Sequence, residues 1–210
     1  MKKIVCLLLA LTCVFALFSC KGEDPQAAFF AMIEESEPTS IITQTTHTRE
    51  NGITYNGMYT TAITEDGFVF EYKYETVAAV VPGADTTNSV QTTEGEIVYN
   101  GSRYSTDGGT TWVDEAPDVA YMQIKLALTK ENIGEYEMSR DGKTLTATIS
   151  KDAAKAIFGT AVSADSAVLK ITVDGTRLSR VTLAYTTSNA TEVIVETSYT
   201  YEPAPAADAE

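Results

Sequence analysis

The feature that most constrains the fold of this chain is a two-residue alternation of apolar side chains. Between residues 68 and 75, Phe68, Phe70, Tyr72 and Tyr74 occupy every second position. Because successive side chains of a strand point to opposite faces, this pattern predicts a strand with one packed face and one wet face. The same alternation recurs over residues 144–149, 169–173, 181–186 and 193–201.

Asn-Gly and Asp-Gly pairs separate many of these segments. Such pairs suit two-residue hairpin turns, which need a positive φ at both central positions. They are Asn51-Gly52, Asn56-Gly57, Asp66-Gly67, Asn100-Gly101, Asp107-Gly108, Asp141-Gly142 and Asp174-Gly175. The first two pairs are too close together for both to form tight hairpins. The series predicts a largely antiparallel meander forming one β-rich domain over residues 25–202.

Two helices are predicted from their end signals. Asp24 supplies an N-cap acceptor and Pro25 a favoured first residue for a helix over Gln26 to Glu35, before Pro38. The second helix is short and covers residues 151–158, "KDAAKAIF", with Ser150 as its N-cap and Gly159 as its stop.

Three further segments give weaker patterns. Residues 119–128 fit a strand or a helix, and the alternation of Met122, Ile124, Leu126 and Leu128 favours the strand. Residues 82–93, rich in Pro, Gly, Asp, Asn and Ser, predict an exposed loop. Residues 203–210 contain only Pro, Ala and acidic residues, which is typical of a disordered tail.

The N-terminal segment has the features of an export signal. Lys2 and Lys3 precede an uncharged apolar run over residues 4–18, shorter than the about 20 residues that span a bilayer. The run ends at Leu17-Phe18-Ser19-Cys20, which resembles the lipobox of bacterial lipoproteins, although smaller residues than Phe18 are commoner at its position. That resemblance implies a signal peptide over residues 1–19, diacylglycerol on Cys20 and a lipidated tether over residues 20–24. A plain secretory signal with an incidental Cys20 is the alternative.

Composition limits the partners of the exported domain. Acidic residues outnumber Lys and Arg by 29 to 15, so the chain lacks the basic surface that nucleic acids require. Acyl chains on Cys20 would hold it, as a monomer, on the outer face of the cell membrane. Lys21 is also compatible with an outer-membrane destination, which stays open as an alternative.

The segment over residues 105–112, "STDGGTTW", resembles the Asp-box of sialidases and other β-propeller proteins. In sialidases this motif is a folding element far from the active site, and it recurs in several blades. Here it occurs once, and a propeller of four-stranded blades would not fit in a chain of this length. We therefore interpret the motif as a structural hairpin and not as a sign of glycosidase chemistry.

No other motif predicts catalysis. His47 is the only histidine, and we expect it on the wet face of a strand. The sequence has no zinc, calcium or phosphate-loop pattern, so we predict no metal site, no cofactor and no enzyme activity. A pair of carboxylates that meet only in space would escape such a search.

The aromatic stripe of Phe68, Phe70, Tyr72 and Tyr74 is the candidate ligand face. An apolar face of a curved sheet is either an ordinary filled core, which we favour, or the lining of a cavity for an apolar ligand.

The order of elements, together with the lipobox, resembles the LolA/LppX-type lipoproteins over about Asp24 to Glu202. This resemblance implies an α+β fold: a strongly curved antiparallel sheet, or half-barrel, with the N-terminal helix and the short late helix on one face. It also implies a non-enzymatic, membrane-anchored protein that binds a lipid or another apolar ligand in a cavity under the sheet. The alternative is a surface lipoprotein with a filled core that meets a protein or glycan partner through exposed loops such as residues 82–93.

Overall fold

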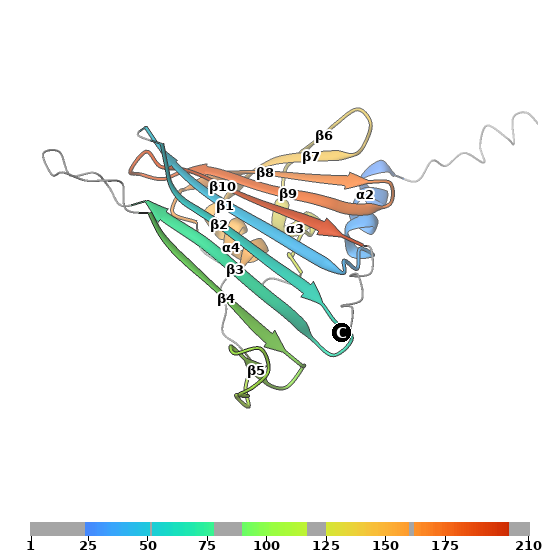
Figure 1. Ribbon diagram of the computed structural model, residues 1–210. Helices are drawn as coiled ribbons and strands as arrows, with labels where there is room; N and C mark the ends of the chain where they lie inside the picture. The colour runs from blue at the N-terminus through green and yellow to red at the C-terminus, as the bar shows by residue number, and fades with distance from the viewer. Residues whose placement is uncertain (1–23, 51, 78–89, 117–124, 160–161, 202–210) are drawn as a thin grey trace, which may run out of the picture.

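The fold is an open, ten-stranded antiparallel sheet in a computed structural model that describes residues 24–50, 52–77, 90–116, 125–159 and 162–201 (Figure 1). The strand order is β5-β4-β3-β2-β1-β10-β9-β8-β7-β6. The chain therefore runs outward from the centre to one edge and then returns from the opposite edge. Its last strand pairs with its first, which joins the two halves into one sheet.

The strands are β1 (Ser40–Arg49), β2 (Gly52–Ile63), β3 (Phe68–Val77), β4 (Val90–Tyr99), β5 (Tyr104–Ser105), β6 (Glu137–Met138), β7 (Thr144–Ser150), β8 (Ser166–Asp174), β9 (Arg177–Thr186) and β10 (Glu192–Thr200). The helices are α2 (Pro25–Glu34), α3 (Lys130–Ile133) and α4 (Lys151–Phe158).

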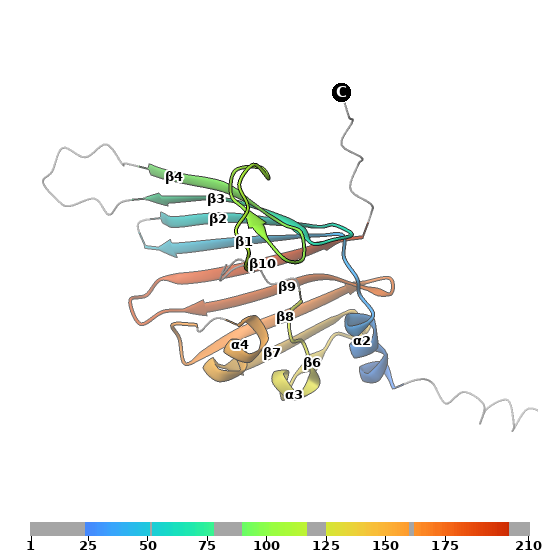
Figure 2. The same cartoon turned by 90° about the horizontal axis from the view of Figure 1, so that it is seen from below.

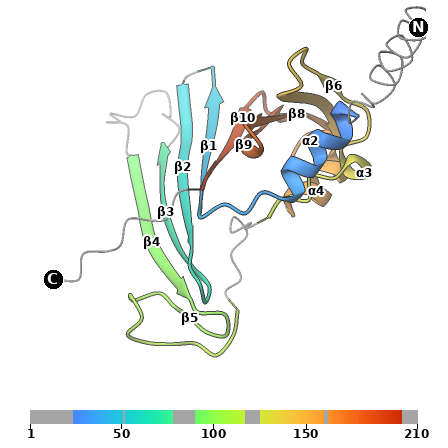
Figure 3. The ribbon, with the colours of Figure 1, turned by 90° about the vertical axis from the view of Figure 1, so that its right-hand side faces the viewer.

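All three helices lie on one face of the half of the sheet formed by β7 to β10 (Figures 2 and 3). The main core fills the space beneath them, where Leu145, Leu169 and Ile171 from the sheet are completely buried. Phe29 from α2 and Ile157 from α4 enter the same core. The alternating burial of β7, β8 and β9 confirms that these strands have one packed face and one wet face.

The other half of the sheet, β1 to β4, carries a smaller aromatic core. Tyr59, Phe68 and Phe70 are buried there, and Tyr72 and Tyr99 pack against them. In the described part of the chain, α2 packs on β8 and β9, and α4 packs on β7 and β8, so neither helix packs on this half.

The sheet is not strongly curled, so the prediction of a half-barrel is wrong in its curvature, and the fold is mostly β. Strong curling needs bulges or glycine kinks along the strands. In the described ladders the register shifts at His47/Thr48 and at Thr172/Val173, both close to a hairpin turn. The strands therefore pair without interruption through their middles, and the sheet stays open.

The end signals of both predicted helices are confirmed. Asp24 caps α2 by accepting a hydrogen bond from the Gln26 N–H at 3.1 Å. Ser150 caps α4 by accepting one from the Ala153 N–H at 3.2 Å. Gly159 ends α4 in the left-handed conformation, with φ of 69°. No helix in the described residues is long and apolar enough to cross a membrane.

Several local predictions are wrong. Asn56-Gly57, one of the two pairs too close together for both to form tight hairpins, is not a turn and lies inside β2, where the rings of Tyr55 and Tyr59 cover the glycine. Residues 90–93, expected in a loop, belong to β4, whose polar side chains are exposed beside the sheet edge. Residues 125–128 make no strand, although Leu126 and Leu128 both point inward as an alternation predicts.

The remaining predictions fall on parts of the chain outside the description. These are the signal peptide and Cys20, Asn51, residues 82–89 of the loop, residues 119–124 and the tail over 203–210.

Candidate functional site

The candidate site is a groove between α2 and the extended segment over residues 125–129, which leads into α3. Its volume is about 730 Å³, within the range of about 300–1,000 Å³ that is typical of small-molecule sites. The apolar lining comes from Ala27, Phe30, Ile33, Pro38, Leu126, Ala127, Leu128, Leu178 and Tyr199. We call this feature the α2 groove.

The first wall is formed by α2, which presents two faces. Phe29 faces inward and is completely buried in the main core, which fixes the helix on the sheet. Ala27, Phe30 and Glu34 follow one another at helical spacing along the groove side. The Phe30 ring packs edge-on against Tyr136 with centroids 5.7 Å apart, and the Tyr136 hydroxyl donates a hydrogen bond to Gln26 Oε1 at 2.9 Å.

Ser36 anchors the end of this wall to the sheet. Its hydroxyl donates to the Met32 carbonyl oxygen at 2.6 Å and accepts from the Leu178 N–H at 2.8 Å. One side chain therefore joins the last turn of α2 to the start of β9. Leu178 also forms part of the groove floor, so this contact fixes wall and floor together.

The second wall is held by α3 and α4. The Ala127 N–H donates to the Ile157 carbonyl oxygen at 3.2 Å, and Asn132 Nδ2 donates to the Ala127 carbonyl oxygen at 3.0 Å. These two bonds hold an extended segment that pairs with no strand. Leu126 and Leu128 then point toward the core while the segment borders the groove.

The groove combines a neutral interior with a charged rim. Burial raises the pKa of the Tyr199 hydroxyl well above its ordinary value, so this floor residue stays uncharged. The rim carries two acids, Asp24 and Glu34, and two bases, Lys125 and Lys130. Such a site suits an apolar body with a polar end, because the rim can solvate a headgroup while the lining covers the rest.

The predicted ligand face lies elsewhere. Phe68 and Phe70 are 4% and 1% exposed and pack within the smaller aromatic core, while Tyr72 and Tyr74 are half-buried beyond it on β3. None of the four lines the α2 groove. Cys20 lies outside the described residues. The sequence did predict the helix over Gln26 to Glu35, which forms the first wall of the groove.

The Asp-box-like segment forms a hairpin turn, as interpreted from the sequence. The buried Ser105 hydroxyl donates to Asp107 Oδ1 at 2.7 Å and accepts from the Gly109 N–H at 2.9 Å. Asp107 Oδ1 also accepts from the backbone N–H groups of Thr110 and Thr111 at 3.0 and 2.8 Å. The motif residues thus satisfy one another, which is the function of a turn.

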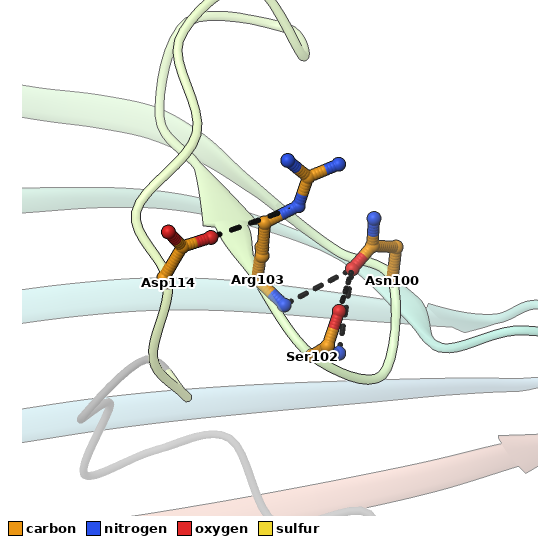
Figure 4. A network of polar contacts seen from close by, with 4 residues as sticks. All are labelled: Asn100, Ser102, Arg103 and Asp114. Carbon is orange, nitrogen blue, oxygen red and sulfur yellow. Dashed lines mark hydrogen bonds and ion pairs between the residues drawn. The ribbon is translucent and has the colours of Figure 1, made fainter.

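The loop before this hairpin is closed in a similar way (Figure 4). Asn100 Oδ1 accepts hydrogen bonds from the N–H groups of Ser102 and Arg103 and from the Ser102 hydroxyl. Arg103 reaches Asp114 across an exposed 4.0 Å ion pair and lies 5.2 Å from the centre of the Trp112 ring. These contacts hold the loop against the hairpin.

A second turn of this kind lies between β6 and β7, at the predicted Asp141-Gly142 pair. The Ser139 hydroxyl donates to Asp141 Oδ1 at 2.6 Å and accepts from the Thr144 N–H at 2.9 Å. Both turns share the pattern Ser-x-Asp-Gly, with the glycine at positive φ. Because the pattern closes two separate turns here, it is a local folding signal.

Lowering the pH should open the Asp107 turn. Hydrogen bonds from Ser105, and then from Thr111, hold the Asp107 pKa at about 2. Because the Asp107 carboxyl has a lower pKa in the folded chain than in the unfolded chain, its charged form stabilises the fold at pH values above the unfolded pKa. This stabilisation is lost as the pH falls through the folded pKa. We expect the Thr111 amide resonance to titrate with a midpoint near pH 2. The Asp107→Asn variant should lack this titration, and a midpoint at the ordinary value of 3.8 would contradict the prediction.

His47 is not on the wet face. It shares the face of the buried Ile41 and Thr45, and its ring lies 4.9 Å from that of Tyr55. Burial lowers its pKa, so it is neutral at pH 7. Among the described residues, no group of three His, Cys, Asp or Glu side chains could hold a metal ion.

Comparisons with known proteins assign no family. No family model and no curated protein matches the chain. A redesigned beta barrel is 10% identical with a TM-score of 0.21, over 80% of this chain and 91% of that chain. A redesigned beta barrel bound to DFHBI is 13% identical with a TM-score of 0.20, over 80% of this chain and 95% of that chain. These scores indicate no more than a distant likeness between antiparallel sheets.

Proposed function

We propose that this protein is a non-enzymatic envelope lipoprotein that binds a lipid or another apolar ligand in the α2 groove. The observation that carries the proposal is the groove itself, with a volume of about 730 Å³ and a largely apolar lining. Its charged rim suits an amphiphile. Ser36 fixes the first wall to β9, and Asn132 fixes the second wall to α3. A more specific version of this proposal is that the protein carries lipids, as the resemblance to the LolA/LppX-type lipoproteins implies.

In this proposal the groove lies next to the membrane. Acyl chains on Cys20 would hold the chain on the outer face of the cell membrane, where it acts as a monomer. The five residues from Cys20 to Asp24 can extend at most roughly 18 Å. Because α2 forms one wall of the groove, a lipid would leave the bilayer close to its binding site.

The direct test is native mass spectrometry on a soluble chain that begins at Gly22, incubated with oleic acid and with phosphatidylglycerol. The proposal expects a bound adduct with the mass of one of these probes. A chain that stays free of both, with its fold intact by circular dichroism, would overturn it.

Filling the groove should weaken this binding. Ala27 is exposed and lines the groove, so tryptophan at this position would occupy the ligand's space without disturbing the core. We expect Ala27→Trp to lower the affinity for the bound probe by about tenfold or more.

The matched control is Ala31→Trp. Ala31 is an exposed residue on the same helix but does not line the groove. This variant should bind like the parent protein. Equal losses in both variants would mean that α2, and not the groove, is the sensitive feature.

A further inference from the structure

The half of the sheet without helices carries a second candidate surface, built from Tyr55 on β2 and from Tyr72 and Tyr74 on β3. We call these three residues the tyrosine platform. They are all half-buried, and they lie on the face of the sheet that bears the smaller aromatic core. None of the three lines the α2 groove, so this surface is separate from the proposed lipid site.

The rings of the platform are nearly parallel to one another. The planes of Tyr55 and Tyr74 differ by 26° with centroids 5.8 Å apart, and those of Tyr72 and Tyr74 differ by 22° with centroids 6.3 Å apart. The three rings therefore pack as a row of aromatic side chains across two adjacent strands.

Glycines make this arrangement possible. Tyr72 pairs across the ladder with Gly95 on β4, and a Cβ atom on Gly95 would lie only 2.4 Å from the Tyr72 hydroxyl oxygen. The ring therefore lies down over the backbone of β4. Gly57 has the same role beneath Tyr55, whose hydroxyl lies 2.8 Å from the equivalent Cβ position. Such packing of an aromatic ring over a strand glycine holds the ring against the backbone.

The platform is polar at its margins but carries no formal charge. The hydroxyl groups of Tyr55 and Tyr59 are hydrogen-bonded to each other. Thr93 pairs with Tyr74 across the ladder and adds a neutral hydroxyl to the same face, and His47 is neutral beside Tyr55. The charged residues of β3, which are Glu71, Lys73 and Glu75, alternate onto the opposite face.

We infer that the tyrosine platform is a binding surface for an uncharged glycan, with the flat faces of its sugar rings stacked on Tyr72 and Tyr74. One face of a pyranose ring presents several C–H bonds, whose partial positive charge matches the negative face of an aromatic ring. The hydroxyl groups around the platform can bond the hydroxyl groups of the sugar. A neutral partner fits best, because the platform is uncharged and the whole chain has a net charge of −14, which repels anions.

The test uses the full-length protein in a detergent without a sugar headgroup. Cellohexaose, maltohexaose and chitohexaose are titrated by calorimetry, with the anionic hexamer of galacturonic acid as comparison. The inference expects at least one neutral hexasaccharide to bind more tightly than the anionic one. Binding of none of the three, or tighter binding of the anion, would overturn it.

Variants then locate the site. Tyr74→Ala should lower the affinity by about tenfold, while Tyr74→Phe, which keeps the ring, should stay within about threefold of the parent. Thr93→Glu, at an exposed position, should also weaken binding by placing a charge beside the ring, and it tests the site even where Tyr74→Ala does not fold.

Lys73→Ala is the control on the same strand but the opposite face, and it should bind normally. Ala27→Trp should also bind normally, which separates this site from the α2 groove. A loss of glycan binding in Lys73→Ala as large as that in Tyr74→Ala would contradict the inference.

Discussion

Replacing Leu169 with alanine is expected to lower the free energy of unfolding by about 2–5 kcal/mol. Leu169 lies in β8 and is completely buried in the main core. It pairs with Ala147 on β7 and with Leu183 on β9, and both of these neighbours are buried as well. Because strands enclose it on both sides, the space left by the side chain cannot close easily, and the cavity adds to the lost burial.

The control for this prediction is the preceding residue. Val168 is 48% exposed on the opposite face of the same strand. Val168→Ala should change the free energy of unfolding by about 0.5 kcal/mol or less. Urea denaturation followed by circular dichroism measures both values. Similar losses for the two variants would mean that the face covered by the helices is not the main core.

This difference between neighbouring residues explains why much of the fold was predictable. Alternation with period two reports which face of a strand is packed, and β7, β8 and β9 follow it closely. The caps of α2 and α4 are equally local, since Asp24 and Ser150 bond N–H groups two and three residues away. Signals of this kind depend on little beyond the neighbouring sequence.

The α2 groove was not predictable in the same way. Its second wall depends on the contact between Ala127 and the carbonyl oxygen of Ile157, which are 30 residues apart in the sequence. Its floor depends on Ser36 meeting Leu178, across 142 residues. No local pattern encodes either contact. The aromatic stripe of β3 was visible in the sequence, but the pattern did not show that Phe68 and Phe70 would be buried and Tyr72 and Tyr74 half-buried.

The curvature of the sheet was predicted wrongly for a related reason. Alternation indicates which face of a sheet is packed, but strong curling depends on where the register shifts. The shift between His47 and Thr48 lies near the end of β1, and the sequence there has no residue that marks a bulge. Gly57 and Gly95 resemble kink-forming glycines, yet they lie beneath tyrosine rings and the ladders continue past them.

Gly67 is the glycine at which a side chain should matter most. It lies in the turn between β2 and β3, beside the end of β4. A Cβ atom there would lie 2.0 Å from the Tyr99 carbonyl oxygen and 3.1 Å from Asn100 Cα. Both neighbours are backbone atoms, and neither can turn away as a side chain can. Gly67 is not at positive φ, so the conflict is one of space and not of conformation.

Gly67→Ala is therefore expected to lower the free energy of unfolding by about 1–3 kcal/mol, the usual cost of overpacking. Gly95→Ala is the matched control, because Gly95 is also not at positive φ and its nearest neighbour is the end of the Tyr72 side chain. That ring can swing aside, and alanine restricts the unfolded chain, so the net change should be below about 1 kcal/mol. Urea denaturation of the two variants measures both changes in the free energy of unfolding. If Gly95→Ala costs as much as Gly67→Ala, the Tyr72 ring is held over β4 as firmly as a backbone, and the tyrosine platform is rigid before any ligand arrives.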